Sequence, residues 1–124
     1  MAINQRRSVK KETGSVYKRD RSKRKSELGR PASLTKIGDK KVKKVRTLGG
    51  NVKPRALQDS KIIVLDGKKK IAAKIIRVVE NSANRHYVRM NVMTKGAIIE
   101  TDKGKVKITN RPGQNGQIQG VLVK

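Results

Sequence analysis

Lysine and arginine are the residues through which this sequence could do chemistry, and that chemistry is the binding of phosphate groups. The chain has 33 of them against nine Asp or Glu, a formal net charge of +24 in 124 residues. Like charges in such excess repel one another and add nothing to the stability of a fold. A polyanion removes that repulsion, and nucleic acid also releases condensed counterions when basic side chains replace them. The charge therefore predicts a nucleic-acid partner.

The basic residues that are candidates for phosphate contact lie mainly in two groups. The first group occupies the N-terminal segment and consists of Arg6, Arg7, Lys10, Lys11, Lys18, Arg19, Arg21, Lys23, Arg24, Lys25 and Arg30. The basic members of the second group, on either side of a Gly-Gly pair, are Lys36, Lys43, Lys44, Arg46, Lys53 and Arg55. Gly49, Gly50 and Asn51, which lie between them, are candidates as well. The remaining candidates are Arg85, Arg89 and Arg111. A single run of lysine and arginine is usually a solvated face, so the prediction depends on the charge of the whole chain.

Two smaller features each have a functional and a structural interpretation. Gly49 and Gly50 could let backbone amides approach a phosphate that a Cβ would obstruct, or they could merely shape an exposed turn. Tyr87 could stack on one unpaired base, or it could belong to the core. Because the chain has two Tyr and no Phe or Trp, modules that stack successive bases on aromatic platforms are disfavoured.

Catalysis finds little support in the sequence. His86 is the only histidine, no Gly-x-Ser-x-Gly elbow surrounds a serine, and neither a Walker loop nor a Gly-x-Gly-x-x-Gly motif occurs. Without cysteine, a disulfide framework and a zinc finger are excluded. We therefore expect no enzyme, no cofactor, no metal and no small-molecule substrate. No apolar segment follows the N-terminal charges and the apolar stretches are short, so neither a secretory signal nor a membrane partner is expected.

Residues 1–33 are predicted to be a basic, extended arm that is disordered in the free protein. Residues 18–25 are almost entirely charged, and nothing in the arm repeats with a period that could bury one face. Pro31 favours an extended conformation of the residue before it, which ends the arm. Most aliphatic side chains lie after residue 56, and residues 34–124 are predicted to form a β-barrel domain.

The second segment predicts an all-β fold, a small barrel of about six or seven short strands. Turn residues separate its apolar segments, and a closed barrel leaves no exposed strand edges. One helical turn is expected at 85–89 and a loop at 110–116. The extended segments are expected at 35–38, 42–48, 52–57, 61–65, 71–79, 97–101, 105–109 and 117–123.

Residues 71–79 fit two interpretations. Their apolar positions follow a helical period better than strict alternation. Most of these side chains are β-branched, however, and the Asp66-Gly67 turn just before them predicts a hairpin with 61–65. We therefore predict a strand, with a bulge near Ile75-Ile76 where the alternation slips.

Ten short motifs, in their order and spacing, connect the chain to a known family. They are Glu27–Ala32, Thr35–Gly38, Lys44–Arg46, Gly49–Asn51, Arg55–Leu57, Glu80–Asn81, Ala83–Arg85, Thr94–Ala97, Ile99–Thr101 and Arg111–Gln114. In these motifs the chain resembles the ribosomal protein S8e (eS8) family, proteins of the small subunit of archaeal and eukaryotic ribosomes. The short stretch between Leu57 and Glu80 is similar to the archaeal form.

The resemblance implies a structural constituent of the small ribosomal subunit that binds small-subunit rRNA without catalysis and supports translation in the cytoplasmic ribosome. Neighbouring small-subunit proteins would be further partners. Pro54 departs from the family pattern, so any contact made there through a backbone N–H would be lost. Charge and composition alone support only a nucleic-acid-binding protein. They leave open a DNA-compacting or other non-ribosomal protein and a small RNA-processing enzyme that uses His86.

Overall fold

The computed structural model of the chain describes residues 5–18, 21–67 and 69–123. The chain divides into two units, Met1–Ala32 and Ser33–Lys124, and each is described here by itself. The predicted end of the arm at residue 33 differs from this division by one position. None of the short helices in the described ranges has the length and hydropathy that a membrane span requires.

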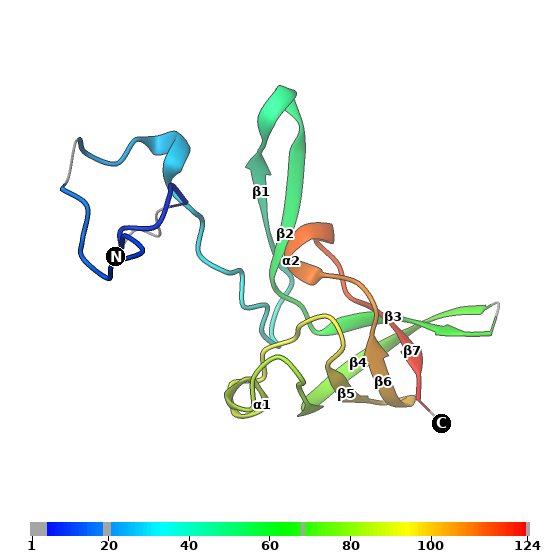
Figure 1. Ribbon diagram of the computed structural model, residues 1–124. Coiled ribbons are helices and arrows are strands. Elements are labelled where there is room, and N and C mark those ends of the chain that lie inside the picture. The colour runs from blue at the N-terminus through cyan, green and yellow to red at the C-terminus, as the bar shows by residue number, and fades with distance from the viewer. Residues whose placement is uncertain (1–4, 19–20, 68, 124) are drawn as a thin grey trace. The chain divides into compact units, whose positions relative to one another are not determined.

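The second unit is built from seven strands and two short helices, with a 3-10 turn between the first two strands (Figure 1). This confirms the predicted all-β class. The first unit contains the 3-10 turn η1 (Lys25–Glu27). The elements of the second unit are β1 (Lys41–Arg46), η2 (Leu48–Gly50), β2 (Val52–Gln58), β3 (Lys61–Asp66), β4 (Lys69–Glu80), α1 (His86–Arg89), β5 (Ile98–Thr101), β6 (Gly104–Ile108), α2 (Pro112–Asn115) and β7 (Gln119–Leu122).

Strands β3 to β7 form a closed five-stranded barrel. Neighbouring strands are antiparallel except β3 and β7, which run parallel and close the barrel. The extended segment expected at 105–109 is strand β6, in which Val106 and Ile108 are buried whereas Lys105 and Lys107 are exposed. The inward side chains form one apolar core: Ile62, Val64, Ala73, Ile75, Val78, Met93, Ala97, Ile99, Val106, Ile108 and Ile118.

β4 turns the corner of the barrel with the bulge that its sequence predicts. Its first half pairs with β3 up to Lys74, and its second half pairs with β5 from Ile75 onward. The register with β5 shifts between Ile75 and Arg77, where an extra residue bends the strand. Just past the bulge, Arg77 Nε donates to Glu100 Oε2 on β5 at 2.6 Å.

β1 and β2 form a separate two-stranded antiparallel sheet, which Figure 1 shows as a ribbon standing apart from the barrel strands. The expectation that these strands belong to the barrel is therefore wrong. β1 has too few apolar residues to line a core, and its side chains are almost all exposed. Every strand of a two-stranded sheet is an edge, and an edge strand can accommodate Pro54, which has no N–H to donate.

The base of this hairpin is fixed to the barrel unit by small, close contacts. Ala56 is fully buried, and its carbonyl accepts a hydrogen bond from Thr35 Oγ1 at 2.7 Å. Pro54 packs on Gly116, just after α2, where an added Cβ would lie 2.7 Å from the Pro54 ring. Gly116 has a φ of 71°, so glycine serves both the turn and the approach.

Two local predictions are wrong. Residues 35–38 do not form a strand, because Lys36 makes only isolated bridges, to Gln58 and to Val92. The segment instead links the hairpin base to the loop before β5. Residues 110–116 contain the helical turn α2, which begins at Pro112 and ends at a left-handed Gly116.

Candidate nucleic-acid interface

The strand register of the β1–β2 hairpin divides its basic side chains between two faces. Residues directly opposite each other in a sheet point to the same face. Lys43 lies opposite Arg55 and Val45 lies opposite Lys53, so Lys43, Lys53 and Arg55 share one face. Lys44, opposite Pro54, and Arg46, opposite Val52, share the other.

The hairpin carries no acidic side chain of its own. From residue 41 to residue 58 the sequence contains no Asp or Glu. Lys43 and Arg55 are like charges directly across the two strands, an arrangement that destabilises an isolated sheet. A phosphate bound between them would attract both side chains and offset their mutual repulsion. The hairpin is therefore better suited to a polyanion than to solvent.

The side chain of Arg55 also suits an anionic partner, because one of its hydrogen-bond donors is unpaired within the described part of the chain. Its side chain is half-buried, and its Nε is a buried donor with no hydrogen-bond partner among the described residues. Buried donors are almost always paired in folded proteins, so an orphan calls for a missing acceptor. The guanidinium offers several donors in a planar fork that matches phosphate oxygens. Among the described residues of the hairpin, Arg55 is therefore the strongest candidate for a phosphate contact.

The hairpin ends in the turn that the Gly-Gly pair predicts. Gly49 and Gly50 have φ values of 71° and 76°, a left-handed conformation that side chains other than glycine rarely adopt. An added Cβ at Gly50 would meet nothing within 4 Å. Asn51 has a structural task, because its Nδ2 donates to the Leu48 carbonyl at 3.2 Å. The turn role is thus confirmed, whereas approach of these residues to a phosphate stays a prediction.

The arm unit presents its basic residues around two local turns. Arg7 stacks its guanidinium over the ring of Tyr17, 4.2 Å from the centroid. A tight reversal pairs Lys10 with Val16. The side chains of Arg6, Lys11, Lys18, Lys23, Lys25 and Arg30 are exposed, and Arg19 lies outside the described residues.

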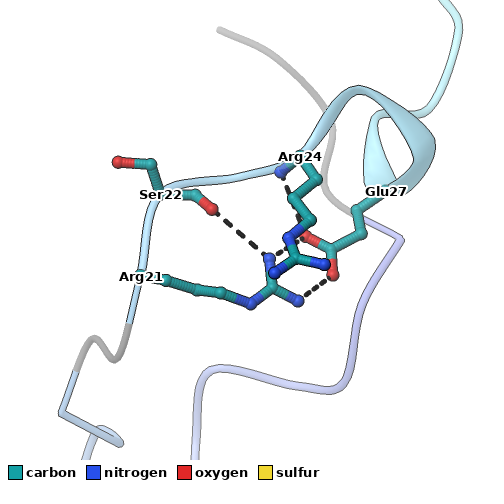
Figure 2. A network of polar contacts seen from close by, with 4 residues as sticks. All are labelled: Arg21, Ser22, Arg24 and Glu27. Carbon is teal, nitrogen blue, oxygen red and sulfur yellow. Dashed lines mark hydrogen bonds and ion pairs between the residues drawn. The ribbon is translucent and has the colours of Figure 1, made fainter.

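The second turn of the arm is organised by Glu27, as Figure 2 shows. Arg21 makes a two-pronged ion pair with this carboxylate, with Nη1 3.0 Å from Oε2. The backbone N–H of Arg24 donates to the same oxygen at 3.2 Å. The hydrogen bond from Arg21, assisted by that of Arg24, lowers the pKa of Glu27 from 4.5 to about 2. Of the arm's predicted site residues, Arg21 is thus already engaged with a carboxylate.

Comparison of the sequence with known proteins shows the family to which the chain belongs. The sequence model of ribosomal protein S8e matches residues 4–123. The chain belongs to the ribosomal protein S8e family. The resemblance found in its motifs is thereby confirmed over almost the whole length.

Three proteins similar to this S8e chain are each named small ribosomal subunit protein eS8 and come from archaea, which confirms the resemblance to the short archaeal form. The small ribosomal subunit protein eS8 of Nanoarchaeum equitans is 49% identical over 114 residues, covering 90% of each chain. That of Methanobrevibacter smithii is 44% identical over 126 residues, covering 99% of this chain and all of its own. That of Methanococcus maripaludis strain C7 is 46% identical over 126 residues, covering 99% and 98%.

The structure does not bring all predicted site residues of the S8e chain together. Lys36 is exposed beside the hairpin base. Arg85 and Arg89 are exposed at the two ends of α1, and Arg111 is exposed at the start of α2. They are available for phosphate contact, but they do not belong to the hairpin's charged faces. Tyr87 is half-buried on α1, between the two interpretations its sequence allowed.

Sequence reasoning missed the lysines on the outer face of the barrel. Lys61 and Lys74 lie directly opposite each other on β3 and β4, and Lys69 and Lys70 lie toward the tip of the same ribbon. Strand alternation around the Asp66-Gly67 turn was the signal that could have found them. Lys61 and Lys74 stand singly in the sequence, so a search for basic runs passes over them, whereas Lys69 and Lys70 belong to a short lysine run that was not selected.

Proposed function

We propose that this S8e-family chain is a structural constituent of the small ribosomal subunit, which binds small-subunit rRNA through phosphate contacts and supports translation. The observation that carries the proposal is the β1–β2 hairpin, which holds facing basic residues, an orphan Arg55 donor and no carboxylate. Family membership supports the rRNA of the small subunit as the polyanion, because the relatives are named for that subunit. It also favours a structural role over a small RNA-processing enzyme.

The binding mechanism follows from the types of side chain. Lysine neutralises phosphates as a point charge, and arginine adds a planar fork of donors. The base of the hairpin is anchored by the hydrogen bond from Thr35 Oγ1 to the Ala56 carbonyl and by the packing of Pro54 on Gly116, and these contacts support its charges. With two Tyr in the chain and one of them under Arg7, stacking on bases contributes little. Phosphate contacts therefore set affinity and position.

A test of the assignment is co-sedimentation of the native protein with small subunits. We expect the protein to remain with the small subunit through a gradient at moderate salt, in the cytoplasmic fraction. Recovery with DNA, or with neither subunit, would instead favour the DNA-compacting alternative. Cross-linking in the same fractions would identify neighbouring small-subunit proteins, the further partners that we propose.

The arm, residues 1–33, is proposed to be disordered in the free protein and ordered on rRNA. Its contacts, such as the ion pair between Arg21 and Glu27, join residues close in sequence and are only partly shielded from solvent, so they add little stability. The pKa of Glu27 reports whether the arm is ordered, because it is low only when the hydrogen bonds from Arg21 and Arg24 are formed. Because pairing lowers this pKa, the turn gains its stabilisation fully above pH 4.5 and loses it as pH falls toward 2.

We expect the Glu27 carboxyl to titrate near 4.5 by NMR in the free protein, with fast amide exchange over the arm. In the rRNA complex, the arm amides should be protected. A Glu27 pKa near 2 together with slow exchange in the free protein would show that the arm folds alone. Arg21→Gln provides the control, since it removes the main cause of the shift and should bring the pKa of Glu27 back toward its ordinary value where the arm is ordered.

A further inference from the structure

The tip of the β1–β2 hairpin carries an apolar side chain that no described residue covers. Leu48 is 95% exposed, and Val52, across the tip, is 55% exposed. A singly exposed apolar residue is common on protein surfaces and needs no explanation. Leu48 differs because the backbone around it is built to hold it outward.

Three hydrogen bonds fix the tip. The N–H of Thr47 donates to the Asn51 carbonyl at 2.7 Å, and its Oγ1 donates to the same oxygen at 3.0 Å. The Asn51 amide donates to the Leu48 carbonyl at 3.2 Å. With two left-handed glycines completing the turn, Leu48 is presented at little further cost in backbone entropy.

The basic residues next to the tip indicate which kind of partner Leu48 contacts. Arg46 is the last residue of β1 before the turn and Lys53 is the second residue of β2 after it, and the two lie on opposite faces of the hairpin. A protein pocket for Leu48 would need an acidic rim to match them. An RNA groove supplies phosphates on both sides and, where a base is unstacked, the apolar faces of base and ribose between them. The arrangement therefore favours RNA over a protein pocket.

We propose that Leu48, with Val52 beside it, is an apolar wedge that packs against a base and ribose within a groove of the rRNA. The flanking phosphates bind the basic residues of the two strands. Leucine is among the side chains that proteins insert against bases in nucleic-acid grooves. This inference rests on the proposed rRNA-binding function and adds a contact that does not depend on charge.

The salt dependence of rRNA affinity distinguishes an apolar contact from a phosphate contact. Burying Leu48 releases no counterions, so Leu48→Ala should weaken rRNA binding by roughly tenfold at every salt concentration. Lys53→Gln should instead make the slope of log K against log salt shallower by about one. Ile76→Ala is the matched control, because Ile76 is 58% exposed on β4, and it should leave affinity unchanged. Leu48→Met should restore most of the affinity.

The decisive measurement combines these titrations with photo-leucine placed at position 48 in assembled small subunits. We expect cross-links from residue 48 to rRNA and a parallel loss of affinity in Leu48→Ala, with the melting temperature unchanged. Unaltered affinity in Leu48→Ala, or cross-links to protein alone, would overturn the wedge and leave rRNA binding intact. Failure of the unaltered protein to bind rRNA would overturn both this inference and the proposed function.

Discussion

Gly120→Ala is expected to destabilise the barrel more than any other single methyl addition in β7. An added Cβ at Gly120 would lie 2.5 Å from Val106 Cγ1 and 2.7 Å from the Lys107 carbonyl oxygen. The first contact belongs to a fully buried core residue and the second to the backbone of the neighbouring strand, so neither can move aside easily. Overpacking of this kind costs about 3 kcal/mol.

The consequence follows from where Gly120 lies. It pairs with Val64 on β3 and with Ile108 on β6, so it is part of the strand that closes the barrel. Thermal unfolding should show a melting temperature lower by about 10 °C or more. Val121→Ala, one residue away and half-exposed, is the control and should shift it by only a few degrees. A Gly120→Ala barrel as stable as the native one would mean that β7 does not close the barrel as described.

Removing the three charges on one face of the hairpin is expected to cost most of the affinity that the barrel unit contributes. The variant is Lys43→Gln, Lys53→Gln, Arg55→Gln, which keeps much of each aliphatic stem. If each group binds one phosphate at about 1 kcal/mol, rRNA affinity falls roughly 100-fold at moderate salt. The salt slope should become shallower by about two to three.

The same variant should fold at least as well as the native protein when free. Lys43 and Arg55 repel each other across the strands, and their replacement removes that repulsion. The control is Lys95→Gln, Lys105→Gln, Lys107→Gln, which removes equal charge from exposed sites on the barrel. Equal losses of affinity in the two variants would show that binding depends on net charge and not on the hairpin.

Local patterns in the sequence were sufficient for most of the barrel. The strand expected at 105–109 and the bulge expected near Ile75-Ile76 each depend on a short stretch of sequence, and both are present. The parallel pairing of β3 with β7 joins segments far apart in the chain, and no local pattern contains it. The turn α2 was missed although Pro112 and Gly116 are ordinary start and stop signals, because one turn is too short to show a period.

The candidate site was predictable to the extent that charge is visible in sequence. Basic runs located the hairpin and the arm, but the division of the hairpin into two faces depends on its register. The orphan Nε of Arg55 and the exposure of Leu48 depend on packing. A leucine beside a strand is normally assigned to the core, so its place at an uncovered tip could be found only in the structure.

The salt dependence of rRNA binding tests the central claim most directly. The affinity of the native protein for small-subunit rRNA would be measured across salt concentrations, beside duplex DNA at matched salt. If about eight phosphates are neutralised, log K against log salt should have a slope of about −6 to −7, with tighter binding to the rRNA than to DNA. A slope shallower than about −2, or equal affinity for DNA, would contradict binding of small-subunit rRNA through phosphate contacts.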